Sequence, residues 1–154
     1  MLKTLLHWRN PDSTLDIITM LSGFFKKGLV SGGVITPVFP NTVPQVTVSP
    51  FKLIGQDGMV VLETTNTVTL TLPTSSTLVI CFKSQYVAGA DPVASYEAIE
   101  LSAYSALSSS EKDLLTIFGV VVTGASIDLP TISYDLRDVV DAVTRNTLRG
   151  MVTA

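Results

Sequence analysis

The middle of the chain alternates between apolar and polar residues, which is the period of a half-buried β-strand. Residues 67–72 alternate strictly, so Val68, Leu70 and Leu72 are predicted to face the core and the threonines to face solvent. Residues 114–122 are apolar almost throughout, as expected for a strand covered on both faces. Further strands are predicted over residues 34–38, 45–48, 59–63, 77–83, 93–101 and 127–132. Short strands about ten residues apart predict a mainly β fold, an antiparallel β-sandwich or a small barrel.

Apolar residues at helical spacing occur before this strand region. Residues 13–27 begin with Ser13 and Asp16, which resemble a capping box, and their apolar positions then fall three or four residues apart. Gly28 supplies a C-terminal stop. We therefore expect an N-terminal helix over about 13–27, followed by a loop from Leu29 to Gly33.

A second helical pattern follows the strands, because an apolar stripe with a period near 3.6 begins after Ser133. This pattern divides the chain into three parts. Residues 1–33 are an N-terminal arm and helix for attachment or oligomerisation, residues 34–134 are the β-sandwich domain, and residues 135–154 are a C-terminal helix and tail. Within the sandwich, the polar run from Ser108 to Glu111 is expected to open a single helical turn.

The composition supports a packed β fold. Of the 154 residues, 46% are hydrophobic and only 15% are charged, whereas charged residues usually make up about 25% of a soluble domain. Disordered chains have low hydrophobicity and high charge, so most of this chain is expected to be folded. Val and Thr occur 19 times each, and both residue types favour strands.

Charge and hydropathy exclude several classes of partner. The net charge is -3 and no stretch carries a dense basic face, so direct binding of nucleic acid is not expected. No apolar run approaches the roughly 18 residues needed to cross a bilayer, so no membrane partner is expected. The apolar start of the chain is short and is broken by His7 and Arg9, unlike a signal peptide. The single Cys81 cannot form an intrachain disulfide and is expected to be a small buried hydrophobe.

Residue types that carry catalysis are scarce. His7 is the only histidine, and it precedes the first predicted helix, where a catalytic base would lack a fixed position. One histidine and one cysteine cannot build the common zinc sites. Gly32 and Gly33 lack the Lys-Ser/Thr of a phosphate loop and are better explained as a turn. We therefore predict a protein that is not an enzyme, with no catalytic residue, metal or cofactor.

The arm offers the most plausible contact surface. An apolar patch that does not fold back onto its own domain usually marks an interface. The predicted contact residues are Leu2, Leu5, Leu6 and Trp8 in the arm, with Phe24 and Phe25 on the helix that follows. Deletion of residues 1–9 is accordingly expected to abolish assembly without unfolding the domain.

A succession of motifs resembles a known group of proteins. It comprises Asp57-Gly58-Met59-Val60-Val61, a Thr-rich strand ending at Leu72-Pro73, Lys83-Ser84-Gln85-Tyr86, Gly89-Ala90-Asp91-Pro92, Tyr96-Glu97-Ala98-Ile99-Glu100, Ser102 to Leu107, Leu115 to Val122 and Ser133-Tyr134-Asp135-Leu136-Arg137-Asp138. Over residues 55–140 this order resembles the β-rich segments of tailed-bacteriophage virion proteins, in particular tail-fibre and baseplate proteins and their attachment domains. The segment from Gly28 to Gly33 is similar to the entry region of such fibre proteins.

The resemblance implies a non-enzymatic structural component of a virion tail, assembled in the host cytoplasm. It implies other virion proteins as partners, and a homo-oligomer, with trimers common in that group. The chain has no long shaft or receptor-binding tip, so a fibre base or adaptor fits better than a complete fibre. Two alternatives remain open: a capsid decoration or cement protein, and a carbohydrate-binding module. The latter would need a row of exposed aromatic residues, for which Tyr86, Tyr96, Tyr104 and Tyr134 are the candidates.

Overall fold

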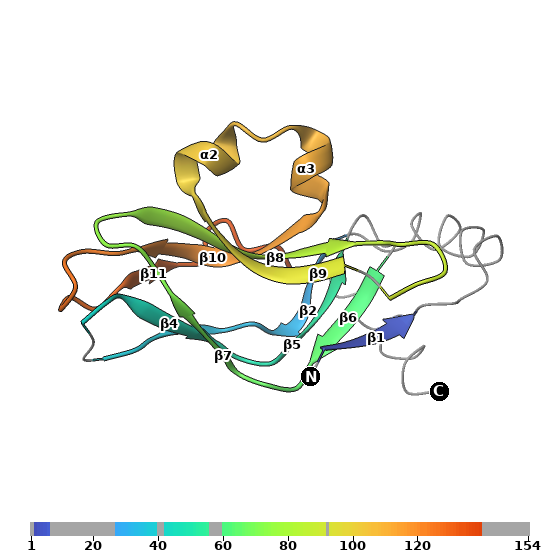
Figure 1. Cartoon of the computed structure of the whole chain (residues 1–154), viewed down its shortest axis with the longest axis horizontal. Coiled ribbons are helices and arrows are strands. Elements are labelled where there is room, and N and C mark those ends of the chain that lie inside the picture. The colour runs from blue at the N-terminus through green and yellow to red at the C-terminus, as the bar shows by residue number, and fades with distance from the viewer. Residues whose placement is uncertain (1, 7–26, 40–41, 56–59, 92, 140–154) are drawn as a thin grey trace.

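The computed structural model describes residues 2–6, 27–39, 42–55, 60–91 and 93–139. Figure 1 shows these residues as a mainly β molecule with two short helices on one side. The elements are β1 (Leu2–Leu6), β2 (Gly28–Gly32), β3 (Ile35–Pro37), β4 (Gln45–Val48), β5 (Phe51–Gly55), β6 (Val60–Thr64), β7 (Val68–Thr71), β8 (Thr77–Gln85), β9 (Val93–Glu100), α2 (Leu101–Ser105), α3 (Ser109–Asp113), β10 (Leu115–Val122) and β11 (Thr131–Ser133).

The described strands form three antiparallel sheets in the orders β1-β6-β5-β2, β3-β4-β7 and β11-β10-β8-β9. The first two sheets are the two halves of one bent layer, because β2 leads into β3, β4 into β5 and β6 into β7 in matching lateral order. The bend passes through Gly32 and Gly33, which both have positive φ, and through Ser49 and Pro50. The third sheet is the second layer.

The two layers enclose one main hydrophobic core. Its centre is a cluster of aromatic rings in which Phe51 lies 5.0 Å from both Phe82 and Phe118, and Phe82 lies 5.0 Å from Tyr96. Buried aliphatic side chains surround the rings and come from both layers: Leu29, Ile35, Val46, Val48, Leu53, Leu62, Leu72, Leu78, Ile80 and Val121. Alternation along each strand supplies these inward positions.

The helices α2 and α3 belong to a crossover. Strands β9 and β10 both pair antiparallel with β8, so they run parallel to each other and the chain must return across the sheet between them. Residues 101–114 make this return and form what we call the helical flap. The flap covers a second apolar cluster on the outer face of the sheet, which includes Val79, Cys81 and Ile117.

Much of the predicted strand pattern is confirmed. Strands occur at all the predicted positions before residue 123, and in β7 the threonines are exposed while Leu72, which follows that strand, is buried. Strand β10 is buried from Leu115 to Val121. The turn near Ser108 is confirmed as α3, where Ser108 and Glu111 form a capping box. The sandwich is not a closed barrel, because the described sheets end in strands that have only one partner.

Several other predictions were wrong. Residues 29–33 are not a loop, because Gly28–Gly32 pairs with β5 as strand β2 and buries Leu29 and Val30. The last predicted strand is shorter, since residues 127–130 form a turn and the end of a loop before β11. Residues 135–139 are a turn and a single bridge between Val139 and Leu29, not the start of a C-terminal helix. Backbone contacts with β2 and β10 replace helical ones there.

The predicted N-terminal helix over about 13–27 lies, apart from its last residue, outside the described residues, as does the rest of the predicted C-terminal helix. Residues 2–6 form β1, which pairs with β6 at the edge of the first sheet. The described parts of residues 1–33 therefore supply two strands that pair with strands of the central region.

Candidate docking surfaces

Only some of the predicted contact residues lie in the described part of the chain. Leu2, Leu5 and Leu6 belong to β1, so their backbone is part of a sheet. Trp8, Phe24 and Phe25 lie outside the described residues. Deleting residues 1–9 would remove an edge strand, and such a deletion would test folding together with docking.

The two most exposed large apolar side chains of the described residues, Ile127 and Phe39, lie on loops at one end of the molecule. Ile127 is 76% exposed and Leu129 is 50% exposed on the β10–β11 loop, and Phe39 is 67% exposed next to β3. Both loops lie at the left-hand end in Figure 1. A hydrogen bond from the Ser75 backbone N–H to the Gly124 carbonyl (2.9 Å) ties the β7–β8 turn to the same end. Large apolar side chains left in solvent together are typical of an interaction surface.

Two of the motif segments, separated by about a hundred residues, meet at the bend. The Arg137 guanidinium donates hydrogen bonds to the carbonyl oxygens of Gly33 (2.8 Å), Phe118 (3.0 Å) and Gly32. It thus joins the bent layer to β10 of the other layer. Partial burial lowers the pKa of Arg137, but a guanidinium stays charged well above neutral pH. Its donors are used within the chain, which makes Arg137 a structural clamp.

Tyr134 completes this clamp on the same side. Its hydroxyl donates to the Ile35 carbonyl (3.1 Å) and accepts from the Ile35 N–H (3.2 Å), while the Arg137 guanidinium lies 5.2 Å from the centre of its ring. These contacts close the side of the sandwich where the edge strands β3 and β11 approach each other. The sequence could not show this, since the partners in the bent layer are 99 or more residues away.

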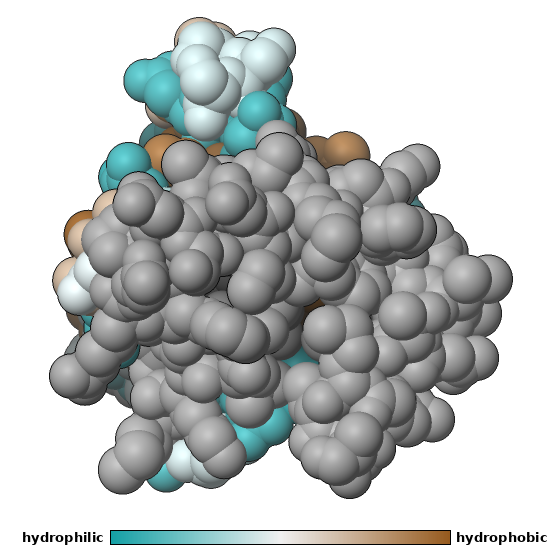
Figure 2. All heavy atoms as spheres, turned by 90° about the vertical axis from the view of Figure 1, so that its right-hand side faces the viewer, coloured by the Kyte–Doolittle hydropathy of each residue, from teal (hydrophilic) through white to brown (hydrophobic). Residues whose placement is uncertain are grey.

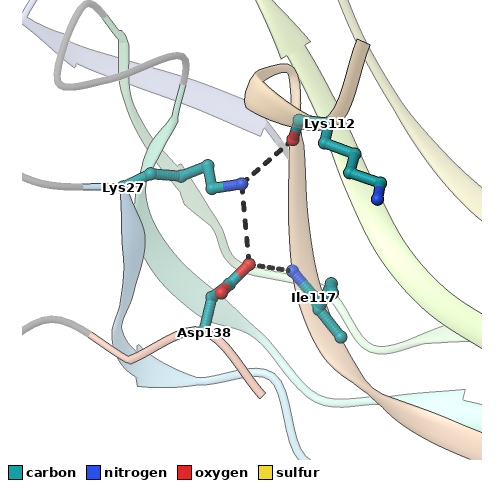
Figure 3. Close-up of polar contacts among 4 residues, drawn as sticks. All are labelled: Lys27, Lys112, Ile117 and Asp138. Carbon is teal, nitrogen blue, oxygen red and sulfur yellow. Dashed lines mark hydrogen bonds and ion pairs between the residues drawn. The ribbon is translucent and has the colours of Figure 1, made fainter. Parts of the chain in front are cut away.

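A second polar cluster holds the start of β2, the end of α3 and β10 together (Figure 3). The Lys27 ammonium donates to the Lys112 carbonyl (3.0 Å) and lies 3.8 Å from the Asp138 carboxylate. That carboxylate also accepts from the Ile117 N–H (3.0 Å), and the Asp138 carbonyl accepts from the Leu29 N–H (2.9 Å). The groups joined by dashed lines all have their partners within the chain, so this cluster is structural too.

Replacing Arg137 by lysine is expected to lower the free energy of unfolding by about 1–3 kcal/mol. An ammonium cannot reproduce a planar fork that reaches three carbonyl oxygens, and hydrogen bonds to charged groups contribute about that much. Urea denaturation followed by circular dichroism measures the change. Lys52→Arg, which keeps a partly exposed ion pair with Glu63, is the control and is expected to change stability by less than about 0.5 kcal/mol. An Arg137→Lys variant as stable as the parent would show that the clamp contributes nothing.

Two hollows lie on opposite faces of β9. The first, the core-side groove, has a volume of about 290 Å³ and is lined by Thr64, Asn66, Val68, Phe82, Ala94, Ser95 and Tyr96. The second, the flap-side crevice, has a volume of about 230 Å³ and is lined by Lys83, Glu97, Ile99, Leu107, Glu111, Leu114 and Leu115. Figure 2 shows the flap as a largely polar projection with apolar atoms at its base.

The titratable groups offer no catalytic arrangement within the described part of the chain. Burial, and then the nearby Glu97, raise the pKa of the Cys81 thiol to about 12, so the reactive thiolate is scarce at neutral pH. Among the residues that the structure describes, no three His, Cys, Asp or Glu side chains gather as a metal site. In the same residues, no helix is long and apolar enough to span a membrane.

The four tyrosines proposed as a carbohydrate platform lie in different surroundings. Tyr96 packs in the aromatic core, Tyr104 packs from the flap against the outer apolar cluster, and Tyr134 bonds to Ile35. Tyr86 packs against the main core. They do not form one exposed row. The sequence analysis did not single out the exposed loop residue Ile127, although the isolated apolar residues between Ser126 and Pro130 were a visible signal.

Comparison of the chain with protein-family models, with curated proteins and with solved structures gives no match. The functional argument therefore depends on the surfaces described above.

Proposed function

We propose that this chain is a non-enzymatic structural component of a phage virion, a tail protein of the fibre-base or adaptor type. Its activity is to dock against neighbouring tail subunits, with other virion proteins as partners and with further copies of itself in a homo-oligomer, such as a trimer. The chain assembles in the host cytoplasm and ends in the virion tail.

The observation that carries this proposal is the exposure of large apolar side chains on the loops at one end of the sandwich. Phe39, Ile127 and Leu129 are each at least half exposed, although they are of the residue types that usually seek a core. Burying them against a neighbour would remove that apolar surface from water. The low fraction of charged residues, 15%, also suits a chain with extensive protein contacts.

Location in the particle tests the proposal directly. Antibodies against the full chain would be used to label particles released by the strain that carries its coding sequence, and electron microscopy would locate the label. Label at the tail is the expected result. Label over the head would favour a capsid decoration protein, and particles that lack the chain would contradict a virion role.

The loop surface is tested by charge insertion in the full chain. Ile127→Asp combined with Phe39→Asp is expected to reduce the amount of the chain incorporated into particles by about tenfold or more, because a carboxylate in an apolar interface loses its hydration. Thr71→Asp combined with Thr74→Asp adds the same two charges at exposed polar positions, at the end of β7 and in the turn that follows it, and is the matched control. Equal incorporation of the double variant and the control would show that this surface is not the docking surface.

A further inference from the structure

The two sides of the sandwich differ. On one side, Arg137 and Tyr134 tie β3 and β11 together. On the other side, β9 ends one layer and β7 ends the other, and among the described residues each pairs with a single strand, β8 or β4. The core-side groove opens between these two edges, since its lining comes from β9, β8, Val68 of β7 and the β6–β7 connection.

Part of the β9 backbone along this edge has no hydrogen-bonding partner among the described residues. The Ser84 N–H donates to the Leu114 carbonyl, and the Ser76 carbonyl accepts from the Thr123 N–H. Even-numbered residues of β8 therefore point their backbone N–H and C=O groups toward β10. Antiparallel pairing then directs the N–H and C=O of Ala94, Tyr96 and Ala98, which lie opposite even-numbered residues, away from β8. No described residue bonds to them. The strand is eight residues long and contains no proline or lysine to block another strand.

The groove face of this edge suits an apolar side chain. Phe82 and Tyr96 form its floor, with ring centres 5.0 Å apart, and Val68 forms part of the opposite wall. On a strand added to β9, a residue opposite Ala94 or Tyr96 would point its side chain to this face. A valine or isoleucine there would cover the edge of the aromatic cluster.

The flap face of the same edge suits a basic side chain. Residues opposite Ser95 or Glu97 on an added strand would point toward the flap-side crevice. Two carboxylates, Glu97 and Glu111, line that crevice with only one ammonium, that of Lys83. A lysine or arginine from the added strand would balance the excess charge and lay its aliphatic stem over Ile99 and Leu107.

We propose that the free edge of β9 is a docking site for an extended segment of a partner protein, which pairs as an additional strand and alternates apolar residues toward the core-side groove with basic residues toward the flap-side crevice. This site is distinct from the loop surface and goes beyond the virion role, so its test is independent of the test of the proposed function. Main-chain bonds supply affinity in this mode, and the alternating side chains supply specificity.

Charge argues against a second copy of the chain as the occupant. Strand β9 carries Glu97 and Glu100 and no basic residue. Two copies paired through β9 would bring four carboxylates to one seam, two on each face if the strands pair in register, with no basic residue of either strand to balance them. A basic partner segment would supply that balance.

The experiment uses the full chain and a synthetic peptide of alternating lysine and valine, blocked at both ends and as long as β9. We expect binding with a dissociation constant below about 1 mM. Hydrogen exchange should show new protection at the N–H groups of Ala94, Tyr96 and Ala98, while the N–H groups of Ser95 and Glu97 are protected with and without the peptide. An alternating glutamate–valine peptide is expected to bind at least about tenfold more weakly. A lysine–valine peptide methylated at alternate backbone nitrogens is expected not to bind.

Two variants separate the backbone and charge contributions. Ala98→Pro removes an outward N–H and no bond to β8, so it should abolish peptide binding and leave the unfolding midpoint near that of the parent. Glu97→Lys should reverse the preference, with the glutamate–valine peptide now bound more tightly, a gain that misfolding cannot produce. Asp135→Lys changes the net charge equally at an exposed position on the closed side and should leave the preference unchanged.

Three results would overturn the proposal. The first is no binding of any of the peptides, and the second is equal binding of the basic and acidic peptides. The third is a chain that sediments as a dimer, with Ala94, Tyr96 and Ala98 already protected, and becomes a monomer on Ala98→Pro. In that case the edge would be filled by a second copy.

Discussion

Replacing Phe118 by alanine is expected to lower the free energy of unfolding by roughly 3–5 kcal/mol. The ring is fully buried and packs 5.0 Å from Phe51, at the point where β10 meets the bent layer. Its loss would leave a cavity between two layers whose positions are fixed by the Arg137 clamp, so the surroundings can collapse only in part. The free energy of unfolding of a small domain is only about 5–15 kcal/mol, so this one change would remove a large part of it.

The midpoint of urea denaturation, with an unchanged slope, measures this effect. Phe39→Ala removes the same side chain at a position that is 67% exposed, and it is expected to change stability by less than about 0.5 kcal/mol. Similar losses in the two variants would mean that the core is not centred on Phe118.

Gly32→Ala is expected to destabilise the chain by about 2–5 kcal/mol, from two costs that add. The backbone at Gly32 has a φ of +70°, a conformation that costs a residue with a side chain about 1–2 kcal/mol. A Cβ atom there would also overlap the Pro50 carbonyl oxygen, and that oxygen belongs to the backbone of the bend and cannot rotate away. Forcing the two strands apart costs about 1–3 kcal/mol more.

Gly89→Ala separates the two costs of the Gly32 change. Gly89 has a similar φ of +74° but lies in an exposed turn between β8 and β9. Its replacement is expected to cost only the conformational part, about 1–2 kcal/mol. Thermal unfolding of both variants, followed by circular dichroism, provides the comparison, and equal shifts in Tm would show that the bend tolerates a side chain at Gly32.

Local patterns predicted the elements whose structure depends on neighbours in sequence. Strands β7 and β10 were predicted from the strict alternation of residues 67–72 and from the apolar run before Thr123. Successive side chains of a strand point to opposite faces, so the pattern shows whether one face or both faces are buried. The helical turn at Ser108 was also predicted from the sequence, and its capping box is local, since both hydrogen bonds join residues three apart. Helix α2 was missed because a single turn is too short to display a period.

Other segments were misassigned because distant residues decide their structure. Leu136 and Val139 fit a helical stripe, yet they are about half exposed, since Arg137 and Asp138 between them bond to β2, β10 and the bend. The paired glycines at 32 and 33 have the positive φ that the predicted turn requires, but Gly32 ends strand β2 and the pair lies at the bend of the layer. The residues before them form a strand because β5 supplies their hydrogen bonds.

The amino-acid sequence by itself determined the β-rich class, the low charge and the positions of most strands, because composition and period-two alternation are local properties. Only the tertiary structure decided which strands end the sheets, which glycines lie at the bend and which apolar residues remain in solvent. An edge strand such as β9, which pairs with one strand among the described residues, is defined by what does not lie on its other side. That depends on the order of strands across a sheet, which no short stretch of sequence encodes.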